Sequence, residues 1–430
     1  MKINSSLLAV IAVGTISGVA HADMSIISGD SVNVQVYGIA DAAVGQVQNS
    51  LGVDPQFPAS VNPVNAIKSS QPGIGSVSGL FNGGISPSRF GIKGDVDVGS
   101  GVKGFFVLES GINVTTGQLS NAGAALASNG GIATTAAANS SIDGQLFSRQ
   151  ANVGLSSADL GSLALGRNYA PIFDTTVAYD PVQASQLFSP LGFSGTLGGG
   201  GGLSEDTRVD NSLKYTKKFG EVNVSALYKF GTATQENGFG GTVGYDNGKL
   251  GLELSYEAFQ NGIKGASGSV PNQVALTNAN TSAIMFAGKY KITNDANLKA
   301  GYETFTLSNP TTNLPTTGAG VGYYNQIVQK LANFNGSNQT TNVYWFGGDY
   351  NVTPKLNLAV GYFDVNQQQS ADLAQKNGDS TYLSLLVDYQ FSKRLDTYAG
   401  FMAAQYSGDA FSSGYYSSNS IFAVGARLKF

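Results

Sequence analysis

Two aspartates and an arginine lie close together in the stretch GRNYAPIFDTTVAYDP, residues 166–181, of a chain with few charges. Asp174 and Asp180 are six residues apart among apolar and aromatic side chains, and Arg167 precedes them. A pair of carboxylates can serve general acid and base chemistry. On a loop, the same pair can instead face a basic wall and bias the passage of ions. The rest of the sequence has to decide between these two interpretations.

The single histidine of the chain, His21, lies in a segment typical of a signal peptide. This segment has a positive start, an apolar run from Leu7 to Val13 and the small-x-small pattern AHA ending at Ala22. A transmembrane anchor is the alternative, but Gly, Thr and Ser dilute the run, which falls short of the roughly 20 apolar residues that a span needs. We therefore expect residues 1–22 to be cleaved.

Cleavage would leave residues 23–430 with neither His nor Cys, and with 23 Lys+Arg against 28 Asp+Glu. Cys/His metal sites, Ser-His-Asp or Cys-His hydrolysis and disulfide scaffolds are then excluded. Chemistry by carboxylates alone and oxygen-ligand metal sites stay open. The acidic balance argues against a nucleic-acid partner. We expect no enzyme activity, no cofactor and no metal.

The composition indicates an exported membrane protein without membrane-spanning helices. Charged residues are 12% of the chain, about half the ~25% of an ordinary soluble domain. Hydrophobic residues are 42%, yet no long apolar run follows residue 22. A β-barrel fits these facts, because its apolar outer face is spread over alternate residues. No linker divides residues 23–430, so we expect a single domain.

Alternating hydrophobicity supports this all-β interpretation. Residues 88–98, 221–230, 250–259 and 422–430 each place apolar side chains on one face and mostly polar or small ones on the other. A soluble antiparallel sandwich also alternates, but it needs a charged exterior that this composition does not supply. The sequence therefore predicts a transmembrane antiparallel barrel with apolar residues facing lipid and polar residues facing a wet lumen.

Connections of two lengths alternate along the chain. Short Gly-, Asn-, Asp- and Pro-containing turns occur at 99–101, 157–161, 218–221, 246–249, 293–297, 351–355 and 392–394. Long irregular stretches lie near 46–85, 116–143, 169–205, 263–279, 309–339, 368–378 and 408–418. Short periplasmic turns and long extracellular loops are typical of outer-membrane barrels. The segments predict about sixteen strands, with fourteen and eighteen as alternatives, around an aqueous channel.

Several stretches resemble the general diffusion porins of Gram-negative outer membranes. VNVQVYGIADAAVG resembles the first strand of that family, and SRFGIKGDVDVGSGVKGFFVLESGI its second and third. FSRQANVGLSSADLGSLALGRNYAPIFD resembles the fourth and fifth strands running into the constriction loop. The terminal strand, with Phe422, Leu428 and Phe430, resembles the signal that the outer-membrane barrel assembly machinery reads.

The resemblance implies a homotrimer whose third long loop, about residues 169–205, folds into the lumen. Loop acids would face basic wall residues there, and the implied constriction comprises Arg89, Arg149, Arg167, Arg208, Asp174 and Asp180. Further residues expected to line the lumen are Lys93, Asp95, Lys103, Glu109 and Lys214. Many relatives carry another acid at the position of Ala184, so the constriction should be less acidic here.

Two of these assignments have alternatives. Arg149 shares its strand face with apolar residues, while Gln150 and Asn152 take the other. Either Arg149 points inward and the polar pair lies at a protein interface, or the phase is reversed; we favour the inward position because charge facing lipid costs ~2–4 kcal/mol at mid-membrane. A loop aspartate can also cap backbone amides, an alternative that suits Asp174 better than Asp180.

The function expected from this resemblance is passive, size- and charge-limited diffusion of small hydrophilic solutes and ions across the outer membrane. The wall arginines suggest a weak anion preference, although the net charge and acids such as Glu253 and Glu257 argue the other way. Expected partners are outer-membrane lipid and lipopolysaccharide. A substrate-specific porin and a barrel adhesin or structural protein are the alternatives; a barrel enzyme lacks the histidine for the usual nucleophile–base pairs.

Overall fold

The computed structural model describes residues 24–29, 32–50, 75–117, 119, 146–191, 208–231, 237–260, 280–308, 338–369, 378–408 and 417–430. The predicted signal peptide, residues 1–22, and most of the predicted long loops lie outside these ranges. Within them, no helix is both long and apolar enough to cross a membrane.

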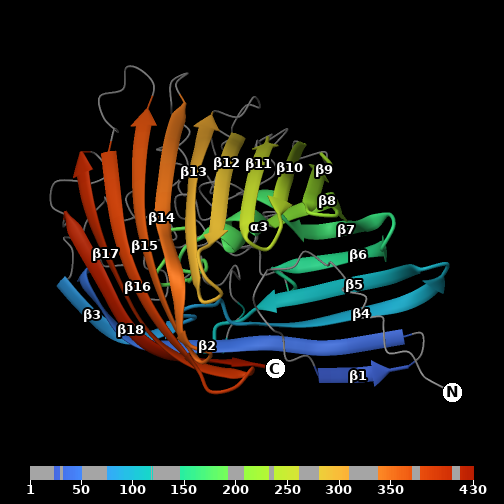
Figure 1. The fold of residues 1–430 in the computed structure, drawn as a ribbon, viewed down its shortest axis with the longest axis horizontal. Helices are drawn as coiled ribbons and strands as arrows, with labels where there is room; N and C mark the ends of the chain where they lie inside the picture. Colours follow the sequence, from blue (N-terminus) through green and yellow to red (C-terminus); the bar gives the residue numbers. More distant parts are fainter. Residues whose placement is uncertain are drawn as a thin grey trace, which may run out of the picture.

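The described residues form one sheet of 18 strands and a single short helix (Figure 1). The strands are β1(Met24–Ser28), β2(Val32–Ser50), β3(Gly75–Asn82), β4(Arg89–Gly99), β5(Val102–Gly111), β6(Gln150–Ser157), β7(Gly161–Tyr169), β8(Arg208–Phe219), β9(Val222–Lys229), β10(Gly238–Asp246), β11(Leu250–Phe259), β12(Asn280–Lys291), β13(Ala296–Ser308), β14(Gln339–Thr353), β15(Leu356–Gln369), β16(Gly378–Gln390), β17(Leu395–Gly408) and β18(Ser418–Lys429). The helix is α3(Pro171–Tyr179).

The sheet closes on itself because β18 pairs antiparallel with β2. Along β2, β4 pairs with residues 32–39 and β3 with residues from 42 to 50, so these two share one position in the wall. In the same way, β1 pairs with β2 beyond the last partner of β18. The wall is therefore a closed antiparallel barrel of 16 strands, which confirms the predicted class and strand number.

Period-two sequences give the barrel its apolar exterior. In β16, Leu383, Leu385 and Val387 are half exposed, whereas the intervening Ser384 and Leu386 are buried on the inner side. Aromatic rings gather where strands meet the short turns, and Tyr389 and Phe391 make an edge-to-face pair with ring centroids 4.9 Å apart. Such placement suits rings at a membrane–water interface.

Each of the seven predicted short turns joins two neighbouring strands. The β10–β11 turn illustrates the local reason: Gly248 has a φ of 82°, which only glycine adopts at no steric cost. The Asp246 carboxylate accepts a hydrogen bond from the Gly248 N–H at 2.8 Å. Side-chain acceptors of this kind stabilise tight turns.

Two segments expected to be irregular contain regular structure. Residues 75–82, within the predicted loop 46–85, form β3, and residues 171–179 form α3. Pro171 occupies the start of α3 and Asp174 lies in its first turn. Both features favour a helix start, since proline presets φ and an acid complements the helix dipole.

A buried apolar cluster departs from the prediction that polar residues face the lumen. Large inward-facing side chains of β9–β17 are buried, including Leu227, Phe259, Met285, Phe305, Trp345, Phe363 and Met402. They pack with residues of the loop segment 170–191, among them Ile172, Tyr179, Val182, Leu187, Phe188 and Leu191. Because burying one such side chain contributes about 1.5–3 kcal/mol, this cluster fixes the segment to the wall.

Candidate channel constriction

The described part of the predicted constriction loop, residues 169–191, runs inside the barrel. Figure 1 shows α3 within the ring of strands, and it contacts β9 to β13. The Trp345 indole N–H donates to the Tyr179 carbonyl oxygen at 3.1 Å. Farther along, the Leu187 N–H donates to the Gly84 carbonyl at 2.9 Å. The loop therefore crosses from β7 to the segment between β3 and β4, while residues 192–205 lie outside the described residues.

Glu109 of β5 brings two of the predicted wall arginines together. Its carboxylate lies 2.6 Å from Nε of Arg149 and 3.8 Å from Nε of Arg89. It also accepts hydrogen bonds from the hydroxyls of Tyr37 at 3.0 Å and Tyr169 at 2.9 Å. Glu109 is thus a buried carboxylate in contact with four side chains, rather than an open lumen acid.

Tyr169, the last residue of β7, connects a third arginine to this group. The guanidinium carbons of Arg149 and Arg208 lie 5.7 Å and 5.6 Å from the centroid of its ring. A ring face attracts cations at such distances. We call Arg89, Arg149, Arg208, Glu109 and Tyr169 the arginine cluster. It has three guanidinium groups against one carboxylate, so its local charge is positive.

The strand phase around Arg149 differs from both alternatives considered above. Val153 and Leu155 are more than half exposed on the outer face of β6, so Gln150 and Asn152 face inward. Arg149 precedes the first residue of β6, and its side chain is nevertheless buried beside Glu109. The polar pair therefore does not lie at a protein interface, because strand alternation starts one residue after Arg149.

Arg167 is held apart from the Glu109 carboxylate. Its Nη1 lies 2.5 Å from the Asp210 carboxylate, and its Nε donates to the Ser148 carbonyl oxygen at 2.8 Å. The β7–β8 register shifts between Gly166 and Asn168. Such a bulge re-aims neighbouring side chains. Arg167 is thus paired with a carboxylate that the sequence analysis did not consider.

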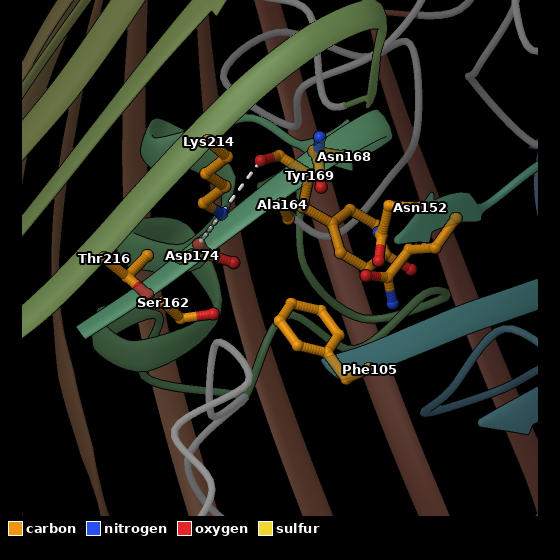
Figure 2. A pocket seen from close by; sticks show the side chains of 10 residues that line it. Phe105, Asn152, Ser162, Ala164, Asn168, Tyr169, Asp174, Lys214 and Thr216 are labelled. Carbon is orange, nitrogen blue, oxygen red and sulfur yellow. Dashed lines mark hydrogen bonds and ion pairs between the residues drawn. The ribbon is translucent and has the colours of Figure 1, made fainter. Parts of the chain in front are cut away.

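The acid Asp174 of α3 is paired with the wall rather than capping backbone amides. Its carboxylate lies 2.5 Å from the Lys214 Nζ, and Lys214 also donates to the Tyr169 carbonyl at 2.9 Å (Figure 2). These two groups neutralise each other across the gap between α3 and β8. The loop acid therefore adds little net negative charge to the constriction.

Asp180 has the environment expected of a structural loop residue. Its side chain is fully buried, accepts a hydrogen bond from the Val182 N–H at 2.7 Å and bonds the Ser189 hydroxyl. Burial raises the pKa of this carboxyl to about 6, against the hydrogen bonds that lower it. The capping alternative thus fits Asp180, not Asp174. Gln183 and Ala184 follow with φ of 63° and 50°, so the turn carries a small backbone strain.

The remaining predicted lumen residues lie nearer the short turns. Lys103 pairs with Asp95 at 3.0 Å, and the Lys93 ammonium lies 5.1 Å from the centroid of the Tyr37 ring. At the end of the chain, Phe430 exchanges two backbone hydrogen bonds with Gly38 of β2. Phe422 and Leu428 are about half exposed on the outer face of β18. Their role as an assembly signal stays a prediction.

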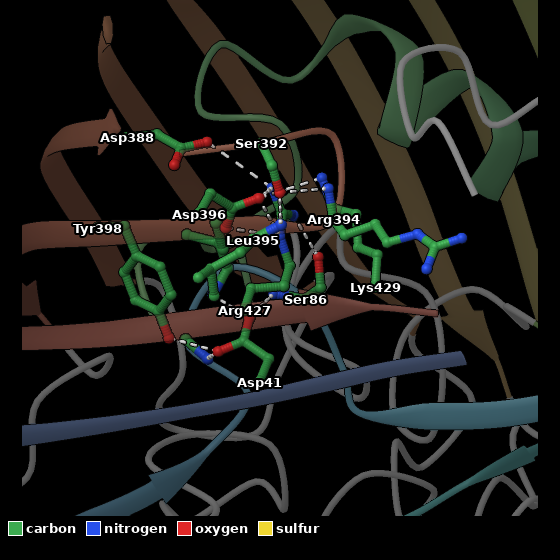
Figure 3. Close-up of polar contacts among 12 residues, drawn as sticks. Asp41, Ser86, Asp388, Ser392, Arg394, Leu395, Asp396, Tyr398, Arg427 and Lys429 are labelled. Carbon is green, nitrogen blue, oxygen red and sulfur yellow. Dashed lines mark hydrogen bonds and ion pairs between the residues drawn. The ribbon is translucent and has the colours of Figure 1, made fainter. Parts of the chain in front are cut away.

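Asp41 of β2, which the sequence analysis missed, anchors the far end of the loop. Its buried carboxylate accepts hydrogen bonds from the N–H groups of Gly84, Ile85 and Ser86 at 2.8–3.2 Å and from the Tyr398 hydroxyl (Figure 3). Because the Gly84 carbonyl receives the Leu187 N–H, Asp41 supports the loop through this segment. One sequence signal existed, namely a single acid on the otherwise apolar face of Ile39 and Ala43.

Ion pairs beside this anchor hold β17 against β18. The Asp396 carboxylate lies 3.0 Å from Nη2 of Arg427 and 3.1 Å from the Lys429 ammonium. Arg427 also donates to the Ser86 hydroxyl at 2.7 Å. Figure 3 shows these charges next to Asp41. Here two cations, Arg427 and Lys429, lie beside two acids, Asp396 and Asp388, so the charges balance, whereas the arginine cluster has three guanidinium groups and one carboxylate.

Of the two acids that argued for cation preference, Glu253 is held by structural contacts and Glu257 is buried. Glu253 accepts hydrogen bonds from the Thr175 hydroxyl at 2.6 Å and the Asn223 amide at 3.0 Å. Glu257 is fully buried. In the part of the chain that the structure describes, no group of three or more Asp, Glu, His or Cys side chains could hold a metal ion.

Comparison with known proteins gives a consistent assignment. A family model described as Gram-negative porin matches residues 8–409. Outer membrane porin proteins of Bordetella pertussis and Delftia acidovorans are each 29% identical, over 62% and 59% of this chain and the same shares of their own lengths. The chain thus spans less than two thirds of these curated relatives.

Solved structures share the fold. An anion-selective porin from Comamonas acidovorans superposes with a TM-score of 0.64 and 22% identity, covering 93% of this chain and all of that one. The trimer form of OmpT from Vibrio cholerae gives a TM-score of 0.56 at 18% identity, with 93% and 100% covered.

Proposed function

The chain belongs to the Gram-negative porin family, and on that premise we propose that it forms an outer-membrane diffusion channel for small hydrophilic solutes and ions, with a weak preference for anions. The observation that carries the preference is the arginine cluster, in which two guanidinium groups lie beside the single carboxylate of Glu109 and that of Arg208 lies over the Tyr169 ring. The name of the anion-selective structural neighbour agrees with this direction.

The charge balance of the loop supports the same sign. Asp174 is matched by Lys214 at 2.5 Å, and Asp180 is fully buried. Positive potential from the cluster is therefore poorly opposed by loop acids. In a narrow passage with low-dielectric walls, such a field raises the local concentration of anions.

The proposal is tested by the zero-current potential of the purified protein in a planar bilayer across a potassium chloride gradient. We expect stepwise conductance and a potential of anion sign. Arg208→Gln should move that potential towards the cation side, whereas Arg394→Gln, at the exposed β16–β17 turn, should leave it unchanged. A cation sign in the unmodified protein would contradict the preference, and absence of conductance would contradict the channel.

The finer expectations belong to this proposal as well. We infer cleavage of residues 1–22, a homotrimer in the outer membrane, contact with lipopolysaccharide, and recognition of Phe422, Leu428 and Phe430 by the barrel assembly machinery. The trimer form among the structural neighbours supports the oligomeric state. Of the two alternatives, an adhesin would give no conductance, and a substrate-specific channel would give solute-dependent current block.

A further inference from the structure

A pocket on the inner wall adjoins the arginine cluster and differs from it in charge. Side chains of β5 to β8 and Asp174 of α3 line it (Figure 2). Its one ammonium, Lys214, is bonded to the Asp174 carboxylate and to the Tyr169 carbonyl. The side chains that line the pocket therefore carry no uncompensated charge of their own.

Neutral hydrogen-bonding groups form one part of the lining. Gln150 and Asn152 contribute carboxamides, and Ser162 and Thr216 contribute hydroxyls. Each of these groups offers both a donor and an acceptor. The Asn152 Nδ2 donates to the Arg167 carbonyl at 3.2 Å, so this side chain is held in position before any solute arrives.

Apolar surface forms the other part. The Phe105 ring lines the pocket beside the methyl group of Ala164. The ring packs against Gly154, where a Cβ atom would lie 2.5 Å from the ring carbon Cζ. Glycine at this position thus lets the ring lie close to β6. The free space of about 530 Å³ includes the open lumen at the edge of the pocket, so a solute held there would stay in contact with the channel.

We propose that this pocket is a subsite for small neutral polyhydroxylated solutes of the monosaccharide class. The C–H face of a sugar ring would pack on Phe105 and Ala164, and its hydroxyls would bond Gln150, Ser162 and Thr216. The subsite rests on the proposed channel function, because solutes reach it through the lumen. One wall would then serve two solute classes, anions at the arginine cluster and neutral sugars beside it.

The test is the salt current through the full-length protein in a planar bilayer, measured with added D-glucose or L-glucose. The two enantiomers have equal viscosity and size, so a difference between them reports fixed contacts in the channel. We expect a saturable current reduction that differs between the enantiomers. Ala164→Leu should fill the pocket and raise the half-saturating concentration at least about fivefold, which is ~1 kcal/mol.

Two further variants keep the test specific. Ala399→Leu makes the same change on β17 at a position flanked by the lipid-facing residues Val387 and Val424, and should leave the sugar response unchanged. Thr216→Val, of nearly equal volume, should weaken the sugar response as Ala164→Leu does.

Equal, linear reduction of the current by both enantiomers would overturn the subsite while the salt current stands. An unchanged response in Ala164→Leu would also overturn it, and absence of any salt current would overturn the channel itself.

Discussion

At the scale of single residues, Lys214 determines how strongly the charge of the loop acid Asp174 acts on an ion in the channel. Its ammonium lies 2.5 Å from the Asp174 carboxylate. Lys214→Met removes that cation and leaves the acid unmatched, so the anion preference should fall. Two charges a few ångströms apart in water interact by about 1 kcal/mol, which corresponds to roughly a fivefold change in the permeability ratio. The zero-current potential measures it, with Lys218→Met at the exposed turn as control.

Residue types predicted which side chains are charged and near the constriction, but not their partners. The arginines and the acids of residues 166–181 were visible in the sequence. The pairing of Arg167 with Asp210, or of Glu109 with two tyrosines, depends on strand register and on the bulge after Gly166. The alternation of residues along one strand predicts neither the register between strands nor the position of a bulge.

At the scale of elements, the loop is held at both ends of its described path, and Asp41 supports the far end. Asp41→Ala would leave three buried N–H groups without their acceptor, and each such loss costs about 1–3 kcal/mol. We expect larger fluctuations of the open-channel current, because segment 84–86 no longer fixes the loop. Asp295→Ala, in an exposed turn, should leave the noise unchanged. Equal noise in both variants would contradict the anchor.

The turn after α3 gives the loop a dependence on pH. The pKa of Asp180 is about 6 in the folded loop and 3.8 ordinarily. Because the folded form binds the proton more tightly, its stability rises as pH falls through about 6, and this gain is complete below 3.8. Current noise should therefore decrease from pH 7 to pH 5. Asp180→Asn should show low current noise at both pH 7 and pH 5. If the noise of this variant still changed with pH, a group other than Asp180 would be responsible.

At this scale, the strands and turns were predictable from the sequence, but the apolar cluster under the loop was not. The period-two strands and their short turns were predictable because each depends on local residues. The apolar cluster under the loop was not, since Trp345 and Phe363 face inward on strands whose outer faces are apolar too. Only the loop packed against them makes an apolar inner face favourable.

At the scale of the whole molecule, lipid exposure sets the tolerance of the barrel to charge. Leu385 lies near the middle of β16 and is 46% exposed. Leu385→Arg should lower the free energy of unfolding in lipid vesicles by about 2–4 kcal/mol. Leu395→Arg, beside the turn, should lower it by only about 0–1 kcal/mol. Equal effects at both sites would contradict the membrane placement of this face.

The contact that closes the barrel joins two strands from opposite ends of the sequence, β2 and β18, which are synthesised first and last. Ile39 of β2 faces Lys429 of β18, so the edge of β2 that pairs with β18 has no partner until nearly the entire chain has been synthesised. Contacts at such large sequence separation form slowly, and an incomplete sheet exposes two unpaired edges that invite aggregation. The unfolded chain must therefore be kept from aggregating until it reaches the membrane. Loss of β18 should reduce the amount of protein inserted in the membrane, because the barrel cannot close.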